Sequence, residues 1–226
     1  MTKYRHEVKV SINYFDKEVL SSRLSFVLKK DKHSGTGGYY KVRSLYFDDI
    51  HDTSLKEKLD GIIYREKYRI RTYDNSNSLI RLEKKVKNNN LGYKESALLT
   101  LSECKDIVYG DYQFLKDRPE MVCKQLYVKM RTGTFKPKTI VEYDREAYVW
   151  EPGRVRITID SNVRTGVSSV DFLNFDLPMV NVINNNTAIL EIKYDNYLPS
   201  HISNLLLINS RQKAAISKYV LGRRFG

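Results

Sequence analysis

The chain has 226 residues, and its 39 lysines and arginines exceed its 27 acidic residues, which gives a formal net charge of +12. Such an excess favours an anionic partner: nucleic acid, an anionic membrane or a phosphate-rich ligand. A hydrophobic content of 41% is enough for a folded core, and the length suits one domain. The N-terminus, MTKYRHEVKV, has no apolar signal region, and no stretch approaches the ~20 apolar residues that cross a bilayer. A cytoplasmic location is therefore the default expectation.

Alternation of polar and apolar residues predicts eight strands. They are expected at residues 4–12, 39–47, 62–73, 78–87, 91–98, 138–148, 154–161 and 187–195. The sequence DNSN at 74–77 is typical of a hairpin loop between the third and fourth strands, and the NNN runs at 88–90 and 184–186 also favour loops. Helices are expected between some of these strands, so the fold class is α+β.

The expected helices carry apolar residues at helical spacing. The first has its N-cap predicted at Asp16 and the apolar positions Phe15, Val19, Leu20, Leu24, Val27 and Leu28. Pro119 is expected to open a second helix with Val122, Leu126 and Met130. Ser200 and Ser210 are expected to cap two C-terminal pieces with Leu205, Leu206, Ile216 and Val220. Cys104 and Cys123 lack metal-type spacing and are predicted to be buried apolar thiols on helices.

The segment YREKYRIRTY at 64–73 places four basic side chains on one face of a strand, because side chains alternate sides. They are Arg65, Lys67, Arg69 and Arg71. Other strands repeat the pattern, with a few acids interspersed: Arg5, Glu7 and Lys9; Arg81, Glu83, Lys85 and Lys87; Arg154, Arg156, Thr158 and Asp160; Glu191 and Lys193. An ordinary sheet with one solvated face explains a single strand of this kind, but it explains several arginine-led faces poorly.

A sheet of about eight antiparallel strands tends to close into a barrel, since closure removes exposed edges. If helices cover the apolar face outside, the charged face lines a basic tunnel. Charges enclosed in this way need a polyanion to balance them. The sequence therefore predicts a closed antiparallel β-barrel with flanking helices, and phosphate between its arginines.

Eight short motifs occur in a characteristic order: RHEVKV, VRSLYFDD, EKLDGIIYREKYRIRTY, IRLEKKVK, VEYDREAY, VRITID, AILEIKY and SKY. This set resembles the polyphosphate polymerase domain of the vacuolar transporter chaperone (VTC) type, over about residues 4–220. That family belongs to the triphosphate tunnel metalloenzymes, in which an antiparallel barrel surrounds a charged tunnel. The resemblance implies growth of an inorganic polyphosphate chain from ATP, with release of a nucleoside diphosphate.

By motif, the resemblance implies the catalytic residues Lys9, Lys58, Arg69, Arg71, Lys85, Arg145, Arg156 and Lys218. It implies Tyr143 and Ser217 as substrate contacts, and Lys193 and Arg43 are added as further expected contacts. Glu191 is the implied ligand for Mn²⁺ or Mg²⁺, with Glu7 and Glu83 as expected helpers, because these ions prefer oxygen ligands. Glu83 beside Lys85 is equally consistent with a charge-balancing residue of the wall.

The superfamily pattern E-x-E-x-K is replaced here by Arg5-x-Glu7-x-Lys9. Loss of the first carboxylate counts against a two-metal hydrolase and suits the polymerase branch. Phosphoryl transfer to a phosphate chain end, already an anion, needs positioning and charge stabilisation but no general base. This chemistry agrees with a site of many basic residues and no catalytic histidine.

Two alternatives stay open. One is a tunnel enzyme that hydrolyses triphosphate or polyphosphate with water. The other is a non-enzymatic module that binds polyphosphate or nucleic acid through basic and aromatic side chains. No nucleic-acid motif is visible, and the basic residues lie on strand faces that the apolar pattern places inside, so no nucleic-acid partner is expected.

Overall fold

The computed structural model describes residues 5–35, 37–89, 91–208 and 216–224, and its strands belong to one antiparallel sheet. The eight predicted strands are all present, with their ends shifted by a few residues. They are β1 (Arg5–Asn13), β3 (Tyr40–Asp48), β4 (Tyr64–Tyr73), β5 (Ser76–Asn88), β6 (Leu91–Leu99), β7 (Lys136–Trp150), β8 (Val155–Thr165) and β10 (Thr187–Tyr194). Two short strands extend the sheet, namely β2 (Lys29–Lys30) beside β7 and β9 (Val180–Asn181) beside β8.

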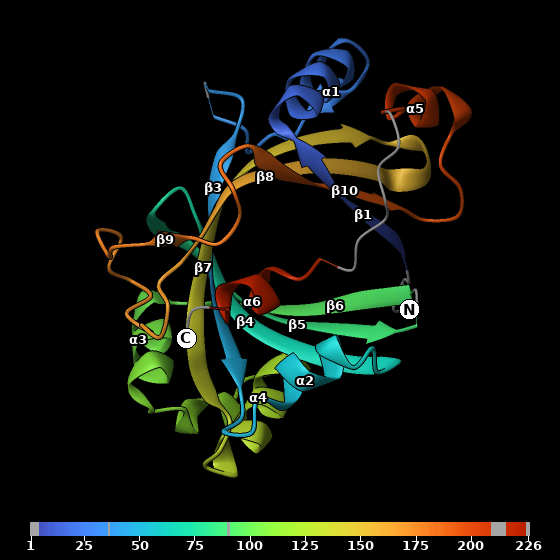
Figure 1. Ribbon diagram of the computed structural model, residues 1–226. Coiled ribbons are helices and arrows are strands. Elements are labelled where there is room, and N and C mark those ends of the chain that lie inside the picture. The colour runs from blue at the N-terminus through green and yellow to red at the C-terminus, as the bar shows by residue number, and fades with distance from the viewer. Residues whose placement is uncertain (1–4, 36, 90, 209–215, 225–226) are drawn as a thin grey trace.

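The sheet closes into a barrel. Its strand order runs β7-β3-β4-β5-β6-β1-β10-β8, and β8 pairs again with β7, from Val141 opposite Thr165 to Trp150 opposite Val155 (Figure 1). Within the described residues, the pairing of β6 with β1 is the shortest contact in the ring and consists of Arg5 opposite Gly92 and His6 opposite Leu91. The closed antiparallel barrel expected from the sequence is thus confirmed.

The hairpin between β4 and β5 is tighter than the expected four-residue loop. Tyr73 pairs with Ser76, so Asp74 and Asn75 alone make the turn, both with a φ of 51°. Two consecutive residues with positive φ are characteristic of a type I′ turn, which asparagine and aspartate tolerate. The turn fixes the register that sets the charged faces of β4 and β5 against each other.

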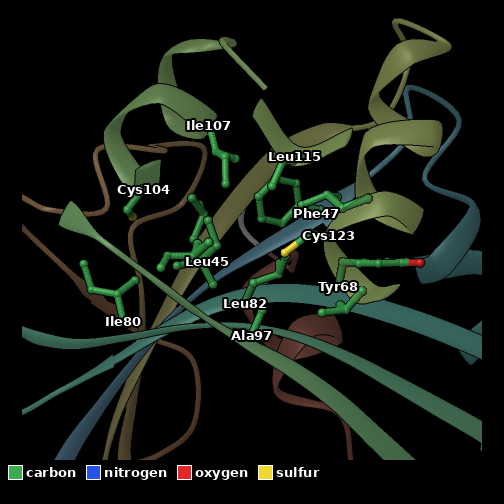
Figure 2. Packing of buried hydrophobic residues seen from close by; sticks show 14 of the residues in the cluster. Leu45, Phe47, Tyr68, Ile80, Leu82, Ala97, Cys104, Ile107, Leu115 and Cys123 are labelled. Atoms are coloured by element: carbon green, nitrogen blue, oxygen red, sulfur yellow. The ribbon is translucent and has the colours of Figure 1, made fainter. Parts of the chain in front are cut away.

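One outer layer covers β3, β4, β5 and β6. It consists of α3 (Leu101–Tyr109), the 3₁₀ helix η1 (Gln113–Lys116) and α4 (Met121–Arg131). Apolar side chains from the outer faces of the strands, such as Leu45 and Leu82, pack there against Ile107 and Leu115 from the helical layer (Figure 2). Cys104 on α3 and Cys123 on α4 are free and fully buried in this cluster, as predicted.

A second outer layer covers β1, β10 and β8, and it contains α1 (Tyr14–Val27) and α5 (Ser200–Leu205). Leu20 and Leu24 of α1 are fully buried in it. The predicted N-cap at Asp16 is wrong, because the side chain of Asn13 accepts the hydrogen bond from the Asp16 N–H at 2.7 Å. Phe15 is 75% exposed, so it does not belong to the core stripe of this helix.

Two further helix starts differ from the prediction, and a third prediction cannot be compared. The N-cap of α4 is Glu120, so Pro119 lies just before the helix instead of opening it. Pro199 is the N-cap of α5, which makes Ser200 its first residue. The last helix, α6 (Lys218–Gly222), is capped by Ser217, whereas the predicted cap Ser210 lies outside the described residues. Within the described part of the chain, no helix is long and apolar enough to cross a bilayer.

Two short helices, α6 and the unpredicted α2 (Thr53–Leu59), are tied to the end of β3 by Asp48. Its carboxylate accepts hydrogen bonds from the Ser54 N–H at 2.9 Å and from the Tyr219 hydroxyl at 2.5 Å. Asp48 is fully buried, so these bonds are protected from competition by water. The carboxylate therefore fixes the two helices against the barrel, with α6 lying within the ring (Figure 1).

Candidate functional site: a basic tunnel cavity

The inner face of the barrel encloses a cavity of about 630 Å³, here called the tunnel cavity. Among the residues that the structure describes, fifteen lysines and arginines line it, against three glutamates. Every predicted site residue except Arg43 is among its lining residues: Lys9, Lys58, Arg69, Arg71, Lys85, Arg145, Arg156, Lys218, Tyr143, Ser217, Lys193, Glu191, Glu7 and Glu83. The strand alternation thus identified the inner face correctly, and the structure brings these residues together in one place.

Arg43 does not line the tunnel cavity, and its prediction as a substrate contact is corrected. The inward positions of β3 are even-numbered, since Ser44 contacts the tunnel arginine Arg71 and Tyr46 lines the cavity. Arg43 therefore points outward, where it is 1% exposed and donates to Glu142 at 3.0 Å and to the Asn174 carbonyl at 2.6 Å. It holds the segment that contains Asn174 against the outside of the barrel.

Arg69 and Arg71 share the carboxylate of Glu83 on the neighbouring strand. Arg69 lies opposite Glu83 and donates to it from Nε at 2.7 Å, while Arg71 is 3.8 Å away. Lys94 of β6 occupies the other oxygen of Glu83 at 2.6 Å. Burial raises the pKa of Glu83, but Arg69, Arg71 and Lys94 hold it well below its usual range. With three cations on its two oxygens, Glu83 fits the charge-balancing wall residue better than a metal ligand.

Arg145 and Lys218 converge on a second carboxylate, that of Asp160 on β8. Arg145 makes a two-pronged pair with it at 2.6 and 2.8 Å, and Lys218 Nζ donates at 2.5 Å. Asp160 is fully buried, and although burial raises its pKa, Arg145 and Lys218 lower it to about 2. This carboxylate joins β7, β8 and α6, so it fixes the position of two predicted catalytic cations.

Arg156 is held from a different part of the chain. Its guanidinium pairs with Asp31, in the loop after β2, and donates to the Tyr40 hydroxyl at 2.9 Å. Asp31 is 7% exposed and also accepts a hydrogen bond from the His33 N–H at 3.0 Å. The planar guanidinium is therefore fixed at one edge, which orients it for contact with an anion in the tunnel cavity.

Glu7 and Glu191 are the two carboxylates that could share a metal ion. Glu7 lies opposite Lys193 in the β1–β10 register, so Glu191 is its diagonal neighbour on the same face. Burial and Glu191 raise the pKa of Glu7, but Lys9 and Lys85 bring it to about 2. Among the described residues, no cluster of three or more His, Cys, Asp and Glu side chains could hold a metal. The donors present fit an ion held by one or two carboxylates and completed by phosphate oxygens.

The sequence matches the VTC domain family over residues 4–225. The chain belongs to that family. The VTC barrel is similar in structure to a proposed adenylyl cyclase from Hippeastrum with a dominant triphosphatase activity, with a TM-score of 0.53, 13% identity, and coverage of 90% of this chain and 84% of that one. A proposed adenylate cyclase from Bacillus halodurans also matches, with a TM-score of 0.48, 14% identity, and coverage of 90% and 86%. A search of curated proteins found no match.

Several residues of this VTC site were not predicted. Asp160 and the lining residue Tyr46 lie inside motifs used for the resemblance, and both have the parity of the inner face. Lys94 was detectable by the same alternation on β6. No sequence feature marked Asp31 as a site residue, because it lies in a loop far from any motif and contacts Arg156 only in the folded protein.

Because the pKa of Lys67 is lowered, we expect anion binding to depend on pH. Burial, followed by the nearby charges of Lys58, Lys9 and Arg65, lowers its pKa to about 7 despite an opposing effect of Asp48. A bound polyanion restores the charged form, so binding above pH ~7 takes up a proton, and affinity falls as the pH rises toward the ordinary lysine value of about 10.4. Titration calorimetry of long-chain polyphosphate at pH 8 in buffers of different ionisation enthalpy measures this uptake, and Lys67→Met should reduce it.

Proposed function

We propose that this VTC domain is a polyphosphate polymerase that transfers the terminal phosphate of ATP to the end of a phosphate chain. The observation that carries the proposal is the lining of the tunnel cavity, to which the described part of the chain contributes fifteen basic side chains and three glutamates. An enclosed excess of this size requires a polyanion, and a phosphate chain repeats the same charge along its length. The family match and the triphosphatase activity of the Hippeastrum protein support a phosphate-chain or triphosphate substrate.

In this reaction a terminal oxygen of the chain forms a bond to the γ-phosphorus of ATP, and the bond from that phosphorus to the β–γ bridging oxygen breaks. ADP leaves, and the chain gains one phosphate. The loose transition state spreads charge over the equatorial oxygens, so its stabilisation depends on cations fixed in advance. Arg69, Arg145 and Arg156 have the required rigidity, because each is paired with a carboxylate.

The substrate supplies its own nucleophile. A phosphate oxygen is ionised near neutral pH, so no residue has to remove a proton. Lys9 and Lys85 lie beside Glu7, and Lys193 lies beside Glu191, so phosphate oxygens would share these lysines with the two glutamates. Glu191 and Glu7 would hold Mn²⁺ or Mg²⁺ together with the substrate. Such an ion would neutralise negative charge on the phosphates.

The test incubates purified protein with ATP and Mn²⁺ or Mg²⁺ and separates long polymer from orthophosphate on a gel. We expect polymer and ADP from the wild type. Glu191→Gln should abolish metal-dependent turnover but keep tripolyphosphate binding, measured as a shift in Tm. Glu146→Gln is the matched control, because that carboxylate pairs with Lys17 on the outer side of the barrel.

Three results would contradict the proposal or part of it. Release of orthophosphate without longer chains would establish the hydrolase alternative. No turnover with any metal, together with retained binding, would support a binding module. Undiminished activity of Glu191→Gln would remove Glu191 from the metal site.

A further inference from the structure

Four basic side chains gather at one end of the tunnel cavity, and we call them the lip cluster: Lys58, Arg65, Lys67 and Lys87. They come from the end of α2, the beginning of β4 and the end of β5. Arg65 lies directly opposite Lys87 in the β4–β5 register, so two like charges face each other across the strand pair. Such a pair is destabilising unless something of opposite charge lies between or above the two side chains.

The lip cluster differs from the rest of the cavity in its lack of carboxylate partners. Each of the other eleven basic residues lining the cavity has a carboxylate within 4.0 Å. These residues are Arg5, Lys9, Arg69, Arg71, Lys85, Lys94, Arg145, Arg154, Arg156, Lys193 and Lys218. Over residues 5–35, 37–89, 91–208 and 216–224, no carboxylate lies that close to a lip residue. Instead, Lys67 Nζ donates a hydrogen bond to the Ser217 hydroxyl at 3.1 Å, and Arg65 donates one to the Ile62 carbonyl.

The surroundings of the cluster confirm that its charges are uncompensated. Burial, Arg65, Lys87 and Lys9 all lower the pKa of Lys58. Burial also lowers the pKa of Lys87, where Glu7 opposes the effect but Arg65 and Lys9 add to it. All four lip residues are half-buried, so water screens their mutual repulsion only in part. The ligand-free fold therefore keeps four basic groups together at a cost in stability, and the lowered pKa of Lys67 reflects part of that cost.

This division of the cavity separates two kinds of binding. Where a cation already has a carboxylate partner, an incoming phosphate competes with that partner and meets a group in fixed orientation. At the lip the basic side chains have no carboxylate partner with which a phosphate must compete. Three of the four are lysines, which act as movable point charges. The lysine-rich lip, which lacks carboxylate partners, suits a phosphate chain that slides through it. The part of the cavity with carboxylate-paired cations suits a phosphate group held in one position.

We propose that the lip cluster is a second anion-binding site that holds a linear phosphate chain beyond the reach of a triphosphate. The proposal rests on the proposed function only for the identity of the polyanion as the growing chain. The binding site itself follows from the charge distribution, and its test requires no turnover. It predicts that affinity depends on chain length, because a triphosphate held in the part with carboxylate-paired cations leaves the lip empty.

The experiment measures binding of long-chain polyphosphate and of tripolyphosphate to the full chain at one fixed salt concentration by titration calorimetry. Loss of two partly desolvated phosphate contacts in Arg65→Gln/Lys87→Gln should weaken binding of the long chain by about tenfold or more. Tripolyphosphate affinity should change by less than about twofold, because its contacts lie elsewhere. The control Lys56→Gln/Lys105→Gln removes the same charge from exposed positions outside the cavity and should bind both ligands like the wild type.

A second measurement excludes simple misfolding. Removing both of the facing like charges should raise the Tm of the ligand-free double variant, whereas a damaged fold would lower it. Equal loss of affinity for both ligands, or no loss for either, would overturn the inference. Single-stranded DNA that binds as tightly, with the same dependence on Arg65 and Lys87, would overturn the assignment to a phosphate chain. If the wild type makes no polymer, the proposed function is wrong. The dependence of binding on chain length still tests whether the lip cluster binds a phosphate chain.

Discussion

Arg69→Ala should reduce kcat for phosphate-chain growth by about 10²–10³-fold, which is the usual effect of removing one preorganised donor to a charged transition state. Arg69 combines a fixed position with access to the cavity. It is held by Glu83 at 2.6 Å from Nη2 and 2.7 Å from Nε, and its side chain is still 19% exposed. The pair orients the guanidinium before the substrate arrives, so no reorganisation is required when charge develops on the phosphate.

The fold should tolerate this change, because Glu83 keeps Lys94 at 2.6 Å and Arg71 at 3.8 Å as partners. The control is Arg118→Ala, which removes an arginine paired with Glu103 and Glu120 outside the tunnel cavity. Both variants should give circular dichroism spectra like that of the wild type. The proposed role of Arg69 would be excluded if its replacement lowered kcat no more than that of Arg118, or if only KM changed.

Much of this site was predictable from the sequence because alternation along a strand is a local property. In YREKYRIRTY the side-chain parity alone places Arg65, Lys67, Arg69 and Arg71 on one face, and all four line the cavity. On β3 the alternation did not reveal which residues face inward, since apolar and aromatic residues occupy both faces there. Arg43 was therefore assigned to the inside, although Ser44 and its even-numbered neighbours hold the inner positions.

Other features depend on contacts that no local pattern encodes. The closure of β8 onto β7 and the pairing of Asp31 with Arg156 each join distant segments. Helix α2 was missed because its seven residues, TSLKEKL, are too few to show a helical period, and it is held by Asp48 through the Ser54 N–H. Helix starts were misplaced by a few residues, since several neighbouring polar residues could each have capped the helix.

The charges of the tunnel lead to a second large effect, at Asp160. Asp160→Asn should lower the free energy of unfolding by about 3–5 kcal/mol, because it leaves two buried cations without their carboxylate. Arg145 is 8% exposed and Lys218 is 8% exposed, so water cannot replace the lost partner. Urea denaturation measures the loss, and Asp117→Asn, an exposed aspartate on the surface, should show almost none.

Acid unfolding supplies an independent measure of the same interaction. The pKa of Asp160 is about 2 in the folded protein against an ordinary value of 3.8, so its contribution to stability is present above pH ~4. That contribution is lost as the pH falls from ~4 to ~2, because the proton binds the unfolded chain more tightly. The free energy of unfolding of Asp160→Asn should therefore fall less steeply than that of the wild type over this range. Parallel curves of this free energy against pH would show that Asp160 does not stabilise the fold through its ion pairs.

Tripolyphosphate should partly rescue the Asp160→Asn variant. In the wild type an incoming phosphate competes with Asp160 for Arg145 and Lys218, whereas in the variant both cations are released for the ligand. Since a ligand that binds only the folded state stabilises it more the more tightly it binds, the rise in Tm at a given concentration should be larger for the variant than for the wild type. A smaller rise would mean that Asp160 acts by positioning the two cations for phosphate more than by competing with it.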